Sequence, residues 1–357
     1  MATAPVLNPA AQIAVPPPYP AATLSRLMDR IERLPLQGWW VYPLLALLQA
    51  GWANAVLWTF GRLPVGSFEP LTFVWMVYGP YALATLALIR ATASRALSDF
   101  WPATGWPLED QAAWRYRFVT LPAGFGLACL TIGTLISVGS LVAAPREALG
   151  AAGGDLPVAM IALLPMSLFG YSLLAMAVAY SVHGMRLVVR IHREAAAVNP
   201  FDRSAVNAFS PLTALGGLSY VGAGYYSLTV NGAFQAGNVA SIIALAAAFL
   251  VGITFFVVPL WGIHERLQHE KARLLLEADA RADAVATELY RQIDAGEFGT
   301  TKNLADSFAG VTAARLRIAQ LPTWPWPPEL FRGFVSALLL PVAVYLLTRL
   351  ATGVIGG

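Results

Sequence analysis

Seven stretches of the chain are apolar almost without interruption, and each is about as long as a helix that crosses a bilayer. They are residues 38–60, 71–90, 118–142, 157–182, 211–230, 238–262 and 331–351. A spanning helix needs about 20 mostly apolar residues, because the hydrocarbon core of a bilayer is about 30 Å thick. The pattern therefore predicts an all-α polytopic membrane protein with seven transmembrane helices.

The fifth stretch has the weakest pattern, because glycine interrupts it at positions 216, 217, 222 and 224. It nevertheless begins with Ser210-Pro211. A capping serine before a first-turn proline is a good start signal for a helix. We therefore count residues 211–230 as a spanning helix.

Residues 22–34 combine an apolar face with a basic face. The apolar positions are Leu24, Leu27, Met28, Ile31 and Leu34, and the basic positions are Arg26, Arg30 and Arg33. This pattern is typical of a helix that lies on the inner membrane surface, or of one that packs on other cytoplasmic helices. The proline-rich residues 1–20 show no periodicity, and we expect them to form a disordered tail.

A second amphipathic helix is predicted over residues 302–320. Its apolar side carries Leu304, Phe308, Val311 and Ile318, which we expect to form an anchor that holds copies of the chain together. Four prolines follow within residues 321–328. They bar a continuous helix, because proline lacks an amide donor, so the chain turns at this Trp-Pro elbow. The plainer interpretation is a loop followed by one more lipid-anchoring helix.

These elements divide the chain into four regions. The fourth and sixth apolar stretches continue as helical patterns over 183–198 and 262–293. The regions are 1–37, the tail and amphipathic cytoplasmic helix; 38–262, a six-helix transmembrane bundle; 263–330, the cytoplasmic helical anchor and elbow; and 331–357, a candidate pore-lining helix.

Composition and charge agree with a membrane protein. The chain is 57% hydrophobic and 12% charged, whereas soluble domains carry about 25% charged residues. With the amino terminus inside, the inner segments hold twenty basic residues and the outer segments hold three. Basic residues gather on the cytoplasmic side, so we predict the amino terminus inside and the carboxyl terminus outside. The small net charge of +3 gives no reason to expect nucleic acid as a partner.

Catalytic and metal-binding patterns are missing from the sequence. His264-Glu265 and His269-Glu270 place two histidines five residues apart, so they do not share a helix face as zinc ligands four apart would. We interpret them as surface histidines on a charged helix. The single cysteine, Cys129, allows no intrachain disulfide. We predict no enzyme activity, no catalytic residue, no metal site and no cofactor.

The apolar stretches hold no ionisable residue in their central parts. Coupled transporters usually keep such residues along their pathway, whereas a hydrophobic constriction can gate a channel by dewetting. The pattern therefore favours a channel over a transporter. It leaves open a membrane protein that conducts nothing. No internal repeat supports an inverted-repeat transporter.

Two groups of residues are candidates for channel function. Aromatic residues in the outer half could line a pocket for a small apolar ligand, or form an ordinary interfacial belt: Phe73, Trp75, Tyr78, Tyr220, Tyr225 and Tyr226. One face of the last stretch could line a pore with a hydrophobic gate, or pack on another helix: Ser336, Leu340, Val344 and Thr348.

The whole layout resembles the seven-transmembrane ion channel superfamily, which contains the insect odorant and gustatory receptors. The shared features are an inner amino terminus, seven helices, cytoplasmic extensions at 183–198 and 262–293, an intracellular helix at 302–320 and a short outer tail. The short carboxyl-terminal signature of gustatory receptors is not matched, since Val344-Tyr345-Leu346 is only a faint echo of it. The resemblance implies a tetramer whose last helix lines a central pore.

The function we expect is therefore an oligomeric, tetrameric ion channel, opened by a small apolar ligand and embedded in the inner (plasma) membrane of a prokaryote. The partners would be the lipid bilayer, other copies of the chain and ions. The alternative is a non-conducting membrane sensor or scaffold that acts through its cytoplasmic helices. A transporter is the third interpretation.

Overall fold

The computed structural model describes residues 17–33, 38–143, 146–195, 199–230, 239–297, 299 and 301–355. In chain order its helices are α1 (Thr23–Glu32), α2 (Val41–Thr59), α3 (Pro70–Thr104), α4 (Leu108–Val119), α5 (Ala123–Ala143), α6 (Leu156–Glu194), α7 (Arg203–Asn207), α8 (Ser210–Val230), α10 (Val239–Asp294), α11 (Thr301–Ala319) and α12 (Pro328–Ile355). Short 3-10 helices occupy Gly38–Trp40 and Arg146–Ala152. The described residues contain no β-strand, only an isolated bridge between Ala21 and Pro122.

The all-α class predicted from the sequence is confirmed. A helix covers most of each of the seven apolar stretches. Among the described residues, α2, α5, α6 and the 246–294 part of α10 are long and apolar enough to cross a membrane. The chain thus has the helices of a membrane protein, whereas a full count of seven spans stays a prediction.

The third apolar stretch begins later than predicted. The sequence pattern starts it at residue 118, but α4 ends at Val119 and α5 begins at Ala123. Thr120 between them is extended. Leu121 directly precedes Pro122, which disfavours the helical conformation at that residue as well. On the other side of α4, Gly105 has a φ of 69° and follows Thr104, the last residue of α3. Only glycine adopts that conformation without strain, which explains why α3 ends there.

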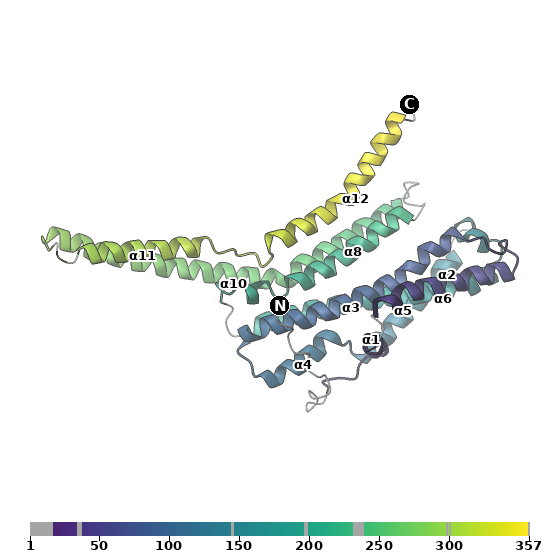
Figure 1. The fold of residues 1–357 in the computed structure, drawn as a ribbon, viewed down its shortest axis with the longest axis horizontal. Coiled ribbons are helices and arrows are strands. Elements are labelled where there is room, and N and C mark those ends of the chain that lie inside the picture. The colour runs from purple at the N-terminus through teal and green to yellow at the C-terminus, as the bar shows by residue number, and fades with distance from the viewer. Residues whose placement is uncertain are drawn as a thin grey trace.

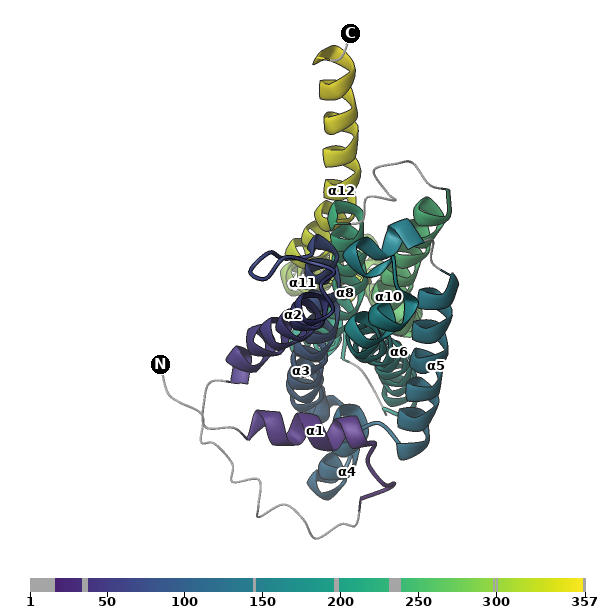
Figure 2. The ribbon, with the colours of Figure 1, turned by 90° about the vertical axis from the view of Figure 1, so that its right-hand side faces the viewer.

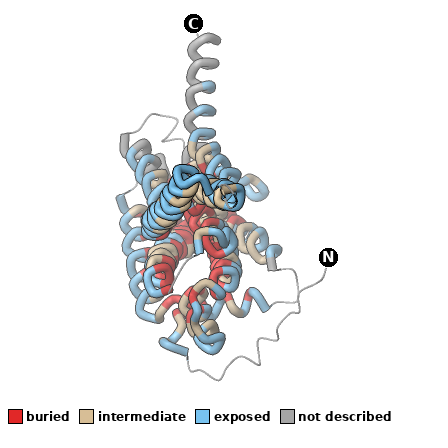
Figure 3. The backbone as a smooth tube through the Cα atoms, turned by 90° about the vertical axis from the view of Figure 1, so that its left-hand side faces the viewer, coloured by how far each residue is buried: buried red, intermediate tan, exposed pale blue. Residues whose placement is uncertain are grey.

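The body of the molecule consists of long helices that lie side by side (Figures 1 and 2), namely α2, α3, α5, α6, α8 and the first part of α10. Helix α6 packs against α2, α3, α5 and α10, and it carries many of the buried residues. Helices α8 and α10 form a pair that contacts the rest through α3 and α6. Buried residues therefore concentrate inside this body, while its outer surface and the projecting helices are exposed (Figure 3).

Two helix crossings in the body depend on glycine. A Cβ at Gly133 of α5 would lie 2.6 Å from the backbone of Ser172 in α6. A Cβ at Gly217 of α8 would lie 2.6 Å from the carbonyl oxygen of Gly252 in α10. Small residues let membrane helices approach this closely, and dispersion contacts then hold them. Gly217, one of the glycines that weaken the fifth apolar stretch in sequence, thus lets α8 lie directly against α10.

Polar contacts hold together the end of the body that carries residues 60–70 and 146–155. Arg62 pairs with Asp155 at 2.7 Å, and a carboxylate oxygen of Glu69 accepts a hydrogen bond from the amide of Ala151 at 2.9 Å. Asn54 accepts a hydrogen bond from the Glu69 amide at 2.9 Å. These contacts tie the α2–α3 connection to the α5–α6 connection. We refer to this end as the loop end.

Helix α1 lies crosswise on the side of the body that carries α4 (Figures 1 and 2). Met28 and Ile31 are buried, and the α3 residue Arg90, only 5% exposed, pairs with Asp29 and Glu32 of α1. Burial raises the pKa of the Glu32 carboxyl, and the positive charge of Arg90 opposes that rise. Part of the apolar face of α1 is therefore packed on other helices, whereas Leu27 is 42% exposed and Leu34 lies outside the described residues. Whether α1 also lies on the membrane surface stays a prediction.

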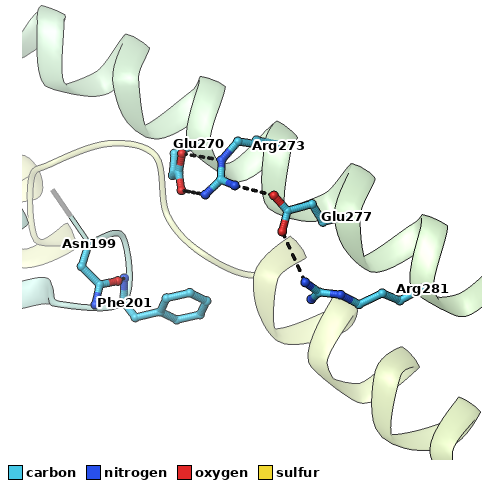
Figure 4. Close-up of polar contacts among 6 residues, drawn as sticks. All are labelled: Asn199, Phe201, Glu270, Arg273, Glu277 and Arg281. Atoms are coloured by element: carbon cyan, nitrogen blue, oxygen red, sulfur yellow. Dashed lines mark hydrogen bonds and ion pairs between the residues drawn. The ribbon is translucent and has the colours of Figure 1, made fainter. Parts of the chain in front are cut away.

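Helices α10 and α11 form a long antiparallel hairpin that projects from the body at the end opposite to the loop end (Figure 1). The 56 residues of α10 correspond to a length of about 84 Å at 1.5 Å per residue. Arg315 of α11 pairs with Asp279 of α10. Along α10, Arg273 pairs with Glu270 and Glu277, and Glu277 pairs with Arg281 at 3.5 Å (Figure 4). We refer to this end as the hairpin end.

Candidate functional site: the elbow and the last helix

The Trp-Pro elbow, residues 321–327, is held against α10 by a column of stacked rings. His264 stacks on Trp324 with centroids 3.8 Å apart, and Trp324 stacks on Trp326 at 5.3 Å. Trp326 then stacks on Phe256 at 4.9 Å, and Phe256 on Phe334 at 4.0 Å. We call these five residues the ring ladder. It links the start of the hairpin, the elbow and the first turns of α12.

Side chains of α8 and α10 also bind the backbone carbonyls of the elbow. Ser210 donates to the carbonyl of Pro325, and Lys271 donates to that of Leu321 at 2.8 Å. Nδ1 of His264 lies 2.9 Å from the carbonyl oxygen of Thr323, so this nitrogen carries the proton and donates. Because the prolines leave few amides for backbone pairing, these side chains take over the role of fixing the turn.

His264 corrects one interpretation from the sequence. It was predicted to be a surface histidine, yet it is 5% exposed and stacked on Trp324. The helical pattern cannot reveal this, because the elbow that covers His264 returns from about 60 residues later in the chain. His269 is exposed, as predicted. In the described part of the chain, no cluster of three or more potential ligands could hold a metal ion.

The last helix leaves the body after its first turns. Phe334 is buried, and its ring fills the space beside Gly217, where a Cβ would lie 2.7 Å away. Beyond it, α12 diverges from α8, its main contact, and points into open space (Figures 1 and 2). The large side chains Leu339, Leu340 and Leu347 are exposed. An apolar helix in this position must be covered by lipid or by other copies of the chain.

The predicted pore face lies on this uncovered part of α12. Ser336 is exposed, Leu340 is 58% exposed and Val344 is 40% exposed. The side chain of Thr348 lies outside the described residues. The described members of this face are therefore not packed into the body of their own chain.

The structure brings together only part of the predicted ligand pocket. The Tyr226 hydroxyl donates to the carbonyl of Phe73 at 2.8 Å, and Tyr78 meets Tyr226 edge-on with centroids 5.4 Å apart. Tyr220 instead stacks on Phe255 at 5.0 Å. Tyr225 is half-buried, and the side chain of Trp75 lies outside the described residues. Phe73, Tyr78 and Tyr226 thus form one group, and Tyr220 belongs to another part of the bundle.

The predicted anchor residues face α10 to different degrees. Leu304, Val311 and Ile318 are half-buried in the hairpin. Phe308 is 37% exposed, and no residue of α11 is fully buried. The hairpin is therefore a single pair of helices with one apolar seam, and much of its surface is open.

Sequence reasoning missed two features of this end of the molecule. One is the Arg90 ion-pair group, whose acidic members lie about 60 residues earlier in α1. The other is the ring ladder, since nothing local marks Phe256 or Phe334 as partners of the elbow. The density of tryptophan and proline in 321–328 was the one available signal.

The fold and this site together define a helical membrane protein. Its last helix is held to the body by the elbow and its first turns, and α10 and α11 form a long hairpin. No family model, curated protein or solved structure matches the chain.

Proposed function

We propose that the protein is an oligomeric ion channel in which α12 of each copy lines a central pore. The observation that carries the proposal is the exposure of α12: its ring-ladder end is fixed to the body, whereas Leu339, Leu340 and Leu347 are each more than half exposed. Packing of several α12 helices around one axis would cover these residues. The layout shared with the seven-transmembrane ion channel superfamily favours four copies.

The pore face supplies a gate. Ser336, Leu340 and Val344 recur at a spacing of four, which places them on one side of a helix. In a symmetric assembly, Leu340 and Val344 would form stacked apolar rings with Ser336 and Thr348 on either side. A narrow apolar ring resists wetting and so blocks hydrated ions until it widens. A small apolar ligand bound near Phe73, Tyr78 and Tyr226 would be the opening stimulus.

The hairpin is the proposed anchor of the assembly. Phe308 is exposed on α11, and Leu276 and Tyr290 are exposed on α10. These side chains could contact neighbouring copies, while Leu304, Val311 and Ile318 keep α11 on α10. With the amino terminus inside, the hairpin lies in the cytoplasm and the carboxyl terminus outside. The membrane is the inner (plasma) membrane of a prokaryote.

The proposal is tested with the purified full chain. Size measurement in detergent and in nanodiscs should give a closed oligomer, and reconstituted bilayers should carry single-channel currents. A monomer in both media, with no current, would exclude the channel.

The second candidate is a membrane scaffold, and the charged hairpin favours it. The ion-paired surface in Figure 4 lies on the projecting part of α10, residues 262–293, which offers a partner a rigid rod of about 48 Å at 1.5 Å per residue. A scaffold would carry no current as a monomer or as an oligomer, so the same recordings separate the two functions.

A further inference from the structure

A groove lies between α6 and α10 at the hairpin end, and its lining residue Trp261 packs edge-on against Trp324 of the elbow. Its volume is about 740 Å³. One part is apolar and lined by Val189, Val258 and Pro259, and the other is polar and lined by Arg193, Arg266 and His269. On α10 the two parts meet where the apolar stretch ends, so the groove follows the boundary between apolar and charged sequence.

The cations of the groove have no acidic partner. Among the described residues, neither Arg193 nor Arg266 pairs with a carboxylate, whereas Arg273, two turns along α10, is paired with Glu270 and Glu277 (Figure 4). The carboxylate in the groove belongs to Glu265, and it accepts a hydrogen bond from the indole of Trp261 at 2.9 Å. Two guanidinium groups thus remain available to an anion.

The guanidinium of Arg266 is held in place. It donates to the carbonyl of His192 and, at 3.0 Å, to the carbonyl of Arg193, which lie in the last turn of α6. These two bonds use part of its five donors and leave the others for a ligand. The ring of His192 packs on Phe100 at 4.9 Å and on Phe209 at 5.3 Å, so we assign it no role in ligand binding.

We propose that this groove binds an anionic phospholipid, with the phosphate on Arg193 and Arg266 and an acyl chain along Val258 and Pro259. A guanidinium matches the geometry of a phosphate, and basic pockets between membrane helices bind acidic headgroups. Trp261, 47% exposed in the same groove, is the side chain typical of the water–lipid boundary. The site does not depend on whether the protein conducts.

The test measures lipid retention by native mass spectrometry. The purified full chain is delipidated in detergent and titrated with phosphatidylglycerol or phosphatidylcholine of identical acyl chains. The parent should retain phosphatidylglycerol selectively. Each basic residue near an anionic lipid is worth roughly fivefold in affinity, so Arg193→Gln should reduce the preference about fivefold and the Arg193→Gln/Arg266→Gln pair about 25-fold.

Two further variants separate a built site from general surface charge. Arg186→Gln removes an exposed arginine of α6 that does not line the groove, and it should leave the preference unchanged within about twofold. Val258→Trp fills the apolar part without a change of charge, and it should reduce retention of both lipids. Because Val258 is exposed, this variant is expected to fold.

Three results would overturn the site. They are equal retention of both lipids by the parent, an Arg186→Gln effect as large as that of Arg193→Gln, or complete displacement of the lipid by inorganic phosphate. The last result would mean that the cations bind a free anion and that the apolar part contributes nothing.

Discussion

Single residues decide how closely the helices of this protein approach. Gly216 and Gly217 are neighbours in α8, yet they differ in what surrounds them. A Cβ at Gly217 would meet the Gly252 carbonyl oxygen and the Phe334 ring, whereas a Cβ at Gly216 would meet nothing within 4 Å. The same residue type is therefore structural at one position and neutral at the next.

We predict that Gly217→Val destabilises the protein and Gly216→Val does not. The added methyl groups at position 217 must push α10 or α12 away, and overpacking of this kind costs about 1–3 kcal/mol. Thermal unfolding in detergent, followed by near-ultraviolet circular dichroism, compares the two variants with the parent. Equal melting temperatures for both variants would show that the α8–α10 contact is looser than described.

At the scale of elements, the elbow holds the last helix in place. The ring ladder connects α10 to α12 through Trp324 and Trp326, and Ser210 adds a hydrogen bond from the start of α8. Phe256 joins the elbow to α12, because it stacks on both Trp326 and Phe334. Any movement of α10 at this level is therefore passed to the base of α12.

We predict that Phe256→Ala releases α12 from the body. Phe256 is buried, and a Phe→Ala change in a core costs about 3–5 kcal/mol. Hydrogen exchange over residues 328–336 should become faster, while exchange in α5 stays as in the parent. Phe331→Ala is the matched control, because Phe331 is exposed and its ring lies 6.3 Å from that of Phe256. Faster exchange in the control but not in Phe256→Ala would contradict the role of the ladder.

At the scale of the whole molecule, the exposed apolar surfaces indicate where lipid or another copy of the chain would contact the protein. The body buries its own core, and large apolar side chains stay exposed on its outer surface, on α12 and on the hairpin. Lipid can cover the body and α12, whereas the hairpin lies beyond the apolar part of α10. In the proposed assembly, neighbouring copies would cover the exposed side chains of the hairpin and of α12.

The proposed gate exists only in an assembly, because its apolar rings require several copies of α12. Leu340→Ser and Val344→Ser should each raise the basal current of reconstituted protein, because a hydroxyl favours water in the apolar ring. Leu338→Ser is the control, because Leu338 packs against the core of its own chain. It should lower stability and leave the current unchanged. Current from Leu338→Ser alone would mean that α12 presents another face to the pore.

The structure shows which anchor residue can be replaced without loosening the hairpin itself. Leu304 and Val311 are half-buried in their own hairpin, so replacing them loosens α11 as well as any assembly. Phe308→Ser instead changes a side chain that is already 37% exposed. We expect it to weaken oligomerisation, measured by analytical ultracentrifugation, with an unchanged melting temperature. Lys302→Ser, at another exposed position of α11, is the control and should assemble like the parent.

The sequence by itself determined the helical class, the apolar parts of the long helices and the elbow at 321–328. It did not predict the extension of α3 to Thr104 or helix α4. The predicted features follow from the spacing of apolar residues and from the chemistry of proline, which act within a few residues along the chain. The same local patterns predicted the pore face and the anchor residues. Local patterns do not show which residues the pore face and the anchor residues contact.

Only the tertiary structure decided which faces meet. Ser210 reaches a carbonyl 115 residues away, and His264 one that is 59 residues away. Gly217 is structural only because Gly252 crosses it, and Arg90 is buried only because α1 returns to cover it. That α12 leaves the body is also a tertiary outcome, because its pattern would equally suit a helix packed within it. Such contacts depend on how whole helices pack, which no local pattern records.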